Sequence, residues 1–119
     1  MVELEWKESI QIQDGRHTGK ITKIDYRTDP YEYTDVFVLL DDVEIEIKYG
    51  CPTVLSENSK LGRMLKAFGQ EFAKGKKVDP EEVLVGKLVQ FMTIAKSREG
   101  KTFSEIVEDS IKPIQPEKV

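Results

Sequence analysis

Val43 to Tyr49 read VEIEIKY, an unbroken alternation of apolar and charged side chains that is the clearest structural signal in the chain. Successive side chains of a β-strand point to opposite faces of a sheet, so this alternation predicts a strand with one buried and one solvated face. The side chains expected on the buried face are Val43, Ile45, Ile47 and Tyr49. Gly50 and Pro52 follow directly and are expected to end the strand.

A helix is predicted after this strand, over residues 58–68. Its apolar side chains recur every three or four residues, at Leu61, Met64, Leu65 and Phe68. Its other side is basic and carries Lys60, Arg63 and Lys66. Gly69 stands where a C-terminal cap is expected, because glycine adopts the left-handed conformation without a steric penalty.

Four further runs that are rich in β-branched and aromatic residues predict strands on either side of this unit. They are residues 16–27, 33–40, 87–96 and 102–108. Gly19 lies inside the first run, and the apolar spacing changes to three residues between Ile21 and Ile24, which indicates a β-bulge or bend. Asp79 and Pro80 are typical of the start of a short helical turn before the fourth strand.

Three strands, a helix and two strands form the element order of the OB fold, a five-stranded barrel in which a helix connects the third and fourth strands. We therefore expect an all-β fold with one helix. The length of 119 residues suits a single domain with one modest core. The expected organisation is an N-terminal arm over residues 1–14, the OB-fold domain over residues 15–112 and a flexible C-terminal tail over residues 113–119.

The residue types limit the chemistry that this domain can perform. A structural zinc site takes four ligands, usually Cys and His, and the chain has only Cys51 and His17. No apolar run approaches the roughly 20 residues that span a bilayer, and the first residues lack the features of a signal peptide. We expect no metal, no cofactor and a cytoplasmic location.

Enzymatic motifs are also weak. Residues 95–102 end like a phosphate-binding P-loop, but Ala95 replaces the first glycine of that pattern, and the segment connects two predicted strands instead of a strand and a helix. His17 lies beside a predicted bend, and no recognisable nucleophile motif accompanies it. Acidic pairs such as Asp41 and Asp42 are typical of solvated turns. We therefore expect a binding protein with no catalytic residues.

Basic and aromatic side chains gather where an OB fold binds oligomers. The formal net charge of -4 argues against bulk attraction to nucleic acid, so binding must depend on local clusters. Single strands are held by cations along the phosphates and by aromatic rings under the bases. OB folds use the face of the second and third strands and the loops after the first and fourth strands. The candidate binding residues are Lys20, Lys23, Tyr26, Arg27, Tyr31, Tyr33, Phe37, Lys48, Lys96, Arg98 and Lys101.

Several of these side chains have a structural alternative. Strand alternation allows Phe37, like Tyr49, to be buried in the core, whereas Tyr31 stands in a turn with little reason to be buried. Lys20, Lys23 and Arg27 are equally typical of a solvated strand surface. Glu44 and Glu46 are expected on the solvated face of the third strand, where they would repel phosphate.

Residues 15–112 resemble an OB-fold nucleic-acid-binding protein and, more loosely, the small single-stranded-DNA-binding proteins of phages and some prokaryotes. The resemblance rests on the element order, Gly19 in the first strand, the stretch SKLGRMLKAFG at residues 59–69 and Val85-Gly86-Lys87 at the start of the fourth strand. It implies sequence-tolerant binding of single strands, DNA more than RNA, in replication or recombination. Residues 114–119 depart from the acidic, aromatic-ended tail with which bacterial single-strand binders recruit partners.

An adaptor for a protein partner is the second hypothesis, because OB folds also serve as protein-interaction modules. In this hypothesis, a partner docks on an acidic face or on the basic helix face of Lys60, Arg63 and Lys66. Binding of a single-stranded oligonucleotide distinguishes the two hypotheses, since only the first requires it.

Overall fold

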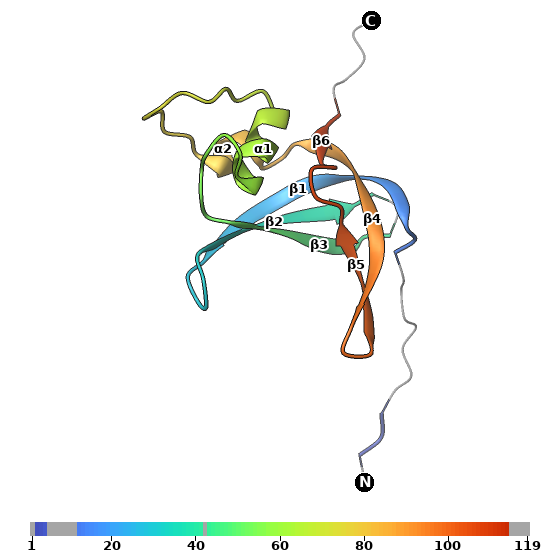
Figure 1. Cartoon of the computed structure of the whole chain (residues 1–119). Coiled ribbons are helices and arrows are strands. Elements are labelled where there is room, and N and C mark those ends of the chain that lie inside the picture. The colour runs from blue at the N-terminus through green and yellow to red at the C-terminus, as the bar shows by residue number, and fades with distance from the viewer. Residues whose placement is uncertain (1, 5–11, 42, 115–119) are drawn as a thin grey trace, which may run out of the picture.

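The chain folds into strands and helices that follow the predicted order, with short additions. The computed structural model describes residues 2–4, 12–41 and 43–114, except for the side chain of Arg98. Its elements are β1 (Gly15–Arg27), β2 (Tyr33–Leu40), β3 (Glu46–Pro52), α1 (Lys60–Ala67), α2 (Pro80–Leu84), β4 (Leu88–Arg98), β5 (Lys101–Ile106) and β6 (Lys112–Pro113). All strands belong to one antiparallel sheet with the order β3-β2-β1-β4-β5, and β6 pairs with β4 (Figure 1).

β1 joins the two halves of the sheet because it is long enough to pair with two strands. Its second half pairs with β2 and its first half with β4. The register with β2 shifts between Ile21 and Lys23, which is the predicted β-bulge. A Cβ atom at Gly19 would lie 2.5 Å from the Leu39 carbonyl oxygen, so only glycine allows this close approach of the two strands. The predicted bulge is confirmed.

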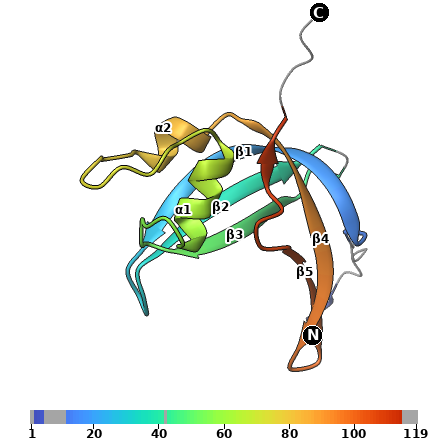
Figure 2. The same ribbon diagram turned by 45° about the horizontal axis from the view of Figure 1, so that its top comes forward.

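The core lies between the inner face of this sheet and α1. Alternate strand residues point inward and are buried, among them Ile21, Val36, Val38, Ile47 and Tyr49. α1 adds Leu61, Met64 and Leu65 from its predicted apolar side. Figure 2 shows α1 lying across the sheet, with α2 nearby. We call the opposite side of β1, β2 and β3, which points away from the core, the outer face.

α1 begins and ends where its flanking residues dictate. The Ser59 side chain accepts a hydrogen bond from the Gly62 N–H at 3.0 Å and caps the N-terminus. Gly69 has a φ of 92° after the last turn, a conformation that ends a helix. The helix predicted over residues 58–68 is therefore confirmed, with ends at Lys60 and Ala67.

The third strand starts later than predicted. The sequence predicted a strand from Val43, but β3 spans Glu46–Pro52. Glu44 has a φ of 48°, and the Leu40 N–H donates to the Ile45 carbonyl oxygen at 2.9 Å, so the residues after Leu40 form the turn into β3. Because Val43 lies in this turn, it is exposed and not buried as predicted.

The sheet is not closed into the predicted barrel. β3 and β5 are its edge strands, and in the described part of the chain no backbone pairing joins them, although they lie near each other. β5 is short, and the chain turns after Ile106 toward β6. The Tyr49 hydroxyl accepts a hydrogen bond from the Asp109 N–H at 3.3 Å, so a side chain bridges part of this opening.

The described part of the chain contains one strand and one helix more than the predicted five and one, and both are short. α2 is the helical turn predicted at Asp79, whose side chain accepts a hydrogen bond from the Glu81 N–H at 3.0 Å. β6 consists only of Lys112 and Pro113, too little sequence to produce a strand pattern. Within the described ranges, neither helix is long and apolar enough to cross a membrane.

Both predicted terminal segments are described only in part. Residues 12–14 lie against β4, where the Ala95 N–H donates to the Asp14 carboxylate at 2.8 Å. At the other end, the Ile114 N–H donates to the Leu88 carbonyl oxygen at 2.9 Å, so sheet contacts continue beyond residue 112. The predictions for residues 5–11 of the arm and 115–119 of the tail lie outside the described residues.

Candidate nucleic-acid interface

The outer face brings together predicted binding residues from three strands. In β2, Tyr33 and Phe37 alternate with side chains that enter the core. Lys23 of β1 and Lys48 of β3 are the residues that pair with Phe37 on its two sides. Arg27 of β1 pairs with Tyr33. Two aromatic rings and three cations therefore share one surface.

Each of the two rings lies under a cation. Lys23 Nζ is 4.6 Å from the centre of the Phe37 ring, and Arg27 Cζ is 5.0 Å from the centre of the Tyr33 ring, both within the range of cation–π contacts. Both aromatic side chains are half-buried, so part of each ring stays accessible. The alternative prediction that Phe37 is buried in the core is therefore wrong. Tyr49, in contrast, is 4% exposed and belongs to the core.

A buried carboxylate, which the sequence analysis overlooked, lies on β2 between these two rings. The Asp35 side chain is 4% exposed. Arg27 donates to it twice, from Nε to Oδ2 at 2.7 Å and from Nη2 to Oδ1 at 3.3 Å. The pairing of β1 with β2 could have predicted this contact. Arg27 pairs with Tyr33, so Asp35 is the diagonal neighbour of Arg27 on the same face.

Acidic side chains share the outer face with the cations. Glu46 is exposed and accepts a hydrogen bond from the Thr22 hydroxyl at 2.8 Å. Asp25 lies 3.8 Å from Lys23 Nζ, with both side chains more than half exposed. Glu44 lies in the turn before β3, so its predicted place on the strand is wrong. A phosphate on this face must therefore contact individual cations, because no broad positive field surrounds it.

Three further predicted residues of this half lie in different places. Lys20 is exposed on the outer face, near the start of the β1–β2 pairing. Tyr31 is 72% exposed in the β1–β2 loop, as predicted. Tyr26 pairs with Thr34, whose side chain is buried, so strand alternation turns Tyr26 away from the outer face. Burial and then the carboxylates of Glu81 and Asp79 raise its pKa. The structure does not bring Tyr26 to the outer face.

The β4–β5 hairpin carries the remaining predicted cations. Glu99 and Gly100 have φ values of 53° and 76° and form its two-residue turn, as expected of a hairpin and not of a P-loop. Lys96 Nζ is 3.0 Å from Glu105 Oε2, and Lys101 is exposed. The side chain of Arg98 lies outside the described part of the chain. In Figures 1 and 2, this turn and the β1–β2 loop both project away from the helices.

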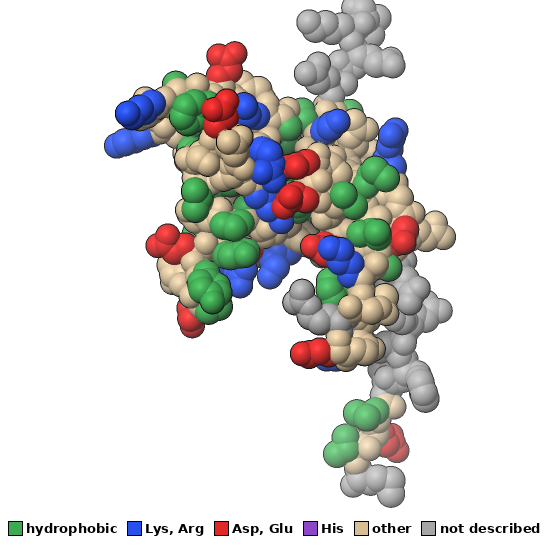
Figure 3. All heavy atoms as spheres, in the orientation of Figure 1, with side chains coloured by type: hydrophobic (Ala, Val, Ile, Leu, Met, Phe, Trp, Pro, Cys, Tyr) green, Lys and Arg blue, Asp and Glu red, His purple; other side chains and the backbone are tan. Residues whose placement is uncertain are grey.

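The basic side of α1, which the adaptor hypothesis uses, is engaged within the chain. Arg63 Nε donates to Asp109 Oδ1 at 2.9 Å, and Arg63 Nη2 lies 3.2 Å from Glu108 Oε2. Arg63 Nη1 also donates to the Asn58 carbonyl oxygen at 2.6 Å. Figure 3 shows basic and acidic side chains side by side between α1 and β5. Arg63 therefore connects α1 to the segment after β5.

The two lysines of this helix side have partners as well. Lys60 Nζ lies 4.3 Å from the centre of the Tyr49 ring, and burial raises the pKa of that tyrosine to about 12. Lys66 Nζ is 3.6 Å from Glu57 Oε1. The basic helix face is therefore less available to an acidic partner than its sequence suggests.

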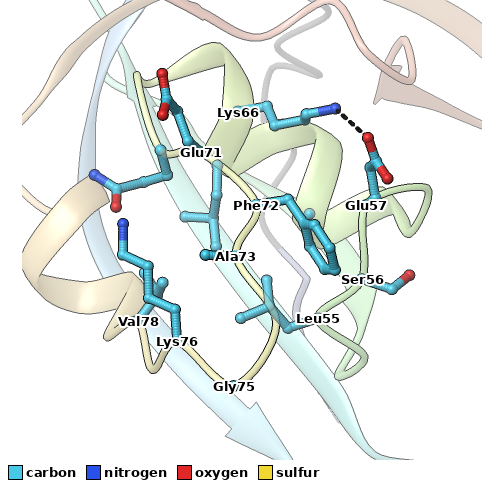
Figure 4. A pocket seen from close by; sticks show the side chains of 13 residues that line it. Leu55, Ser56, Glu57, Lys66, Glu71, Phe72, Ala73, Gly75, Lys76 and Val78 are labelled. Carbon is cyan, nitrogen blue, oxygen red and sulfur yellow. Dashed lines mark ion pairs between the residues drawn. The ribbon is translucent and has the colours of Figure 1, made fainter.

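A small cavity lies between α1 and the segment that follows it. Its volume is about 100 Å³, and its apolar lining includes Leu55, Leu65, Phe72 and Val78, with the Glu57–Lys66 ion pair beside it (Figure 4). Ligand pockets typically measure roughly 300 to 1,000 Å³. No predicted nucleic-acid-binding residue lines this cavity, so it is separate from the candidate interface.

Cys51 and His17 occupy structural positions. Cys51 is fully buried, and burial raises the pKa of its thiol to about 11, so it is not an activated nucleophile. His17 Nε2 lies 2.6 Å from the Gln13 carbonyl oxygen, and its ring stacks on Phe91. Over residues 2–4, 12–41 and 43–114, no three His, Cys, Asp or Glu residues are grouped so that they could hold a metal ion.

No protein-family model matches this chain, and no curated protein matches it either. Its function must therefore be argued from the outer face itself.

Proposed function

We propose that this chain is a non-catalytic, cytoplasmic protein that binds single-stranded nucleic acid, DNA more than RNA, on the outer face of β1, β2 and β3. The observation that carries the proposal is the pair of partly exposed rings, Phe37 and Tyr33, each in contact with a cation. Bases stack on aromatic rings and phosphates bind cations, so this surface offers both interactions. The preference for DNA and a role in replication or recombination rest on the resemblance to small single-stranded-DNA-binding proteins.

The sheet topology supports an OB-fold barrel as the framework of this proposal. The strand order β3-β2-β1-β4-β5 leaves β3 and β5 as neighbouring edges, and α1 connects β3 to β4. An OB fold is a partly open barrel that binds oligonucleotides on the face of strands 2 and 3 and on the loops after strands 1 and 4. The outer face and the two projecting hairpin loops correspond to these regions.

Stacking favours a single strand over a duplex, because only unpaired bases expose their faces to Phe37 and Tyr33. These two residues are four positions apart on β2, which is about 13 Å at a rise of about 3.3 Å per residue. The rings therefore contact different bases of one strand. Lys23 and Lys48 pair with Phe37 on its two sides, so we expect them to meet the phosphates next to the base that stacks on Phe37.

Titration of a labelled oligothymidylate at low salt tests the proposal, with oligouridylate of the same length as the RNA comparison. Replacing Phe37 with Ala should weaken binding roughly 5- to 150-fold, since each stack contributes about 1 to 3 kcal/mol. Phe72→Ala is the matched control, because Phe72 is an exposed ring in the segment after α1. Equal affinity of the wild type and the Phe37 variant would contradict the proposed site.

A protein-interaction adaptor is the second candidate function, and one surface favours it. Met92 and Ile94 of β4 and Phe103 of β5 are 48%, 44% and 40% exposed on the same side of their hairpin. Neighbouring exposed apolar side chains are typical of protein-interaction surfaces. Absence of oligonucleotide binding by the wild type at low salt would favour this function over the first.

A further inference from the structure

Asp35 occupies an unfavourable position for a carboxylate. Its side chain is 4% exposed, and Asp25 is its direct partner on β1. A buried charge is costly unless it is paired and hydrogen-bonded, and like charges across a strand pair repel each other. A Cβ atom at Gly50, its partner on β3, would lie 3.1 Å from Asp35 Oδ1, so glycine leaves room for the carboxylate. Among the described cations, Arg27 is the one that bonds to Asp35.

Arg27 is held from two directions. Nε and Nη2 donate to the two oxygens of Asp35 at 2.7 and 3.3 Å, and Cζ lies 5.0 Å from the centre of the Tyr33 ring. A guanidinium group has five N–H donors in a rigid plane, so the bonds to Asp35 leave both donors on Nη1 and the second donor on Nη2 for a ligand. The Arg27 side chain is 42% exposed, which keeps it within reach of a molecule on the outer face.

Lys23, the other outer-face cation that lies over a ring, has no buried carboxylate partner among the described residues. Its carboxylate partner Asp25 lies at 3.8 Å, and both side chains are more than half exposed. Exposed ion pairs of this kind orient their members weakly. Of the two cations over rings on the outer face, Arg27 is therefore oriented and Lys23 is loosely held, and the buried Asp35 makes the difference.

We infer that Asp35 is a positioning residue of the interface, which fixes Arg27 so that its remaining donors on Nη1 and Nη2 meet a phosphodiester group of the bound strand. The inference rests on the proposed function. The parallel pair that remains, one N–H on Nη1 and the second on Nη2, matches the two non-bridging oxygens of a phosphate, a geometry that an ammonium group does not offer. A negative charge on this face thus promotes phosphate binding, although simple electrostatics gives it the opposite effect.

The inference is tested by whether removal of the Asp35 charge lowers or raises the affinity for oligothymidylate. Asp35→Asn should weaken binding of oligothymidylate about three- to tenfold, because an oriented, charge-assisted hydrogen bond to the ligand is lost. Asp25→Asn is the matched control: it removes the same charge from the paired position on the same face, and it should leave affinity unchanged or strengthen it up to about twofold. Tighter binding by Asp35→Asn would overturn the inference.

Two further variants separate positioning from a general structural effect. In an Arg27→Ala background, Asp35→Asn should change affinity no further, because its effect passes through Arg27. Arg27→Lys keeps the charge but loses the two parallel N–H donors, so it should bind more weakly than the wild type. Full affinity of Arg27→Lys would overturn the inference, and this variant decides the matter even where Asp35→Asn does not fold.

The fixation of Arg27 can also be measured without a ligand. NMR relaxation of the Arg27 Nε–Hε group should report a rigid side chain in the wild type and a flexible one in Asp35→Asn. A flexible Arg27 in the wild type overturns the inference and leaves the proposed function intact. If Arg27 is rigid but the wild-type protein binds no oligonucleotide, the proposed function is wrong, and so is the assignment of a phosphate to Arg27.

Discussion

Two groups of cations lie next to aromatic rings in this molecule, one on the outer face and one on α1. On α1, Arg63 is bonded to Asp109 and Glu108, and the neighbouring Tyr49 ring is buried. On the outer face, the rings of Phe37 and Tyr33 are half-buried, so a ligand can still reach them. The charges on α1 stabilise contacts within the chain, whereas the charges on the outer face remain near accessible rings.

This difference shows that basic and aromatic residues in proximity do not define a ligand site by themselves. The decisive property is whether the ring faces are accessible, because carboxylates pair with cations in both groups. On the outer face, Lys48 is exposed and forms no ion pair with the described residues.

The largest effect is expected when both rings of the outer face are removed. Tyr33→Ala combined with Phe37→Ala should weaken single-strand binding at least about 30-fold, because each lost stack contributes about 1 to 3 kcal/mol. Fluorescence anisotropy with labelled oligothymidylate measures the change, and thermal unfolding confirms that the variant is folded. Retention of wild-type affinity would place the bases elsewhere.

Charge reversal on α1 should lower stability and leave oligonucleotide binding intact. Arg63→Glu replaces two attractive contacts with repulsion from Glu108 and Asp109, so it should lower the Tm while leaving oligonucleotide affinity within about twofold of the wild type. Differential scanning calorimetry and the same binding assay provide the two measurements. A strong loss of affinity without a change in Tm would make α1 part of the interface.

The buried groups on the α1 side should make the domain sensitive to alkali. Burial raises the pKa of Cys51 from 9.0 to about 11 and that of Tyr49 from 10.0 to about 12. The unfolded chain therefore ionises first, so the stabilising contribution is complete below about pH 9 and is lost as pH rises toward 11 and 12.

From this linkage, the free energy of unfolding should fall by about 1 kcal/mol between about pH 8 and pH 10 through Cys51. Urea unfolding at the two pH values measures the change, and Cys51→Val should show a smaller decrease than the wild type. An equal decrease in both proteins would mean that other groups cause the alkaline sensitivity.

The smallest effect concerns a single exposed cation of the outer face. Lys48→Gln should reduce the slope of log affinity against log salt concentration by about 0.7, the value for one phosphate contact with a single strand. Lys74→Gln is the control, because Lys74 is exposed in the segment between α1 and α2. A slope that changes equally in both variants would show nonspecific charge effects instead of a local contact.

The sequence predicted those parts of the fold that depend on local patterns. Both ends of β2 and the position of α1 followed from alternation, turn residues and helical spacing. The start of β3 was wrong because a positive φ at Glu44 overrides the alternation around it. Alternation assigns residues to two faces but does not say which face is buried, so the position of Phe37 stayed open until the strand pairing was known.

The ion pairs of the α1 cations include contacts between distant parts of the chain. Arg63 meets Asp109 across 46 positions, a contact that no local pattern contains. The same holds for Asp35, whose burial requires Arg27 on one neighbouring strand and Gly50 on the other. Residue types and spacing therefore identified candidate cations, and tertiary packing divided them into accessible and engaged ones.

An NMR titration of the labelled full chain with a short oligothymidylate tests the central claim most directly, because it observes both groups in one experiment. We expect the backbone signals of Lys23, Phe37 and Lys48 to shift in proportion to bound ligand, while those of Arg63 and Lys66 on α1 stay unchanged. Shifts confined to α1, or no shifts at low salt, would contradict the assignment of the outer face as the binding surface.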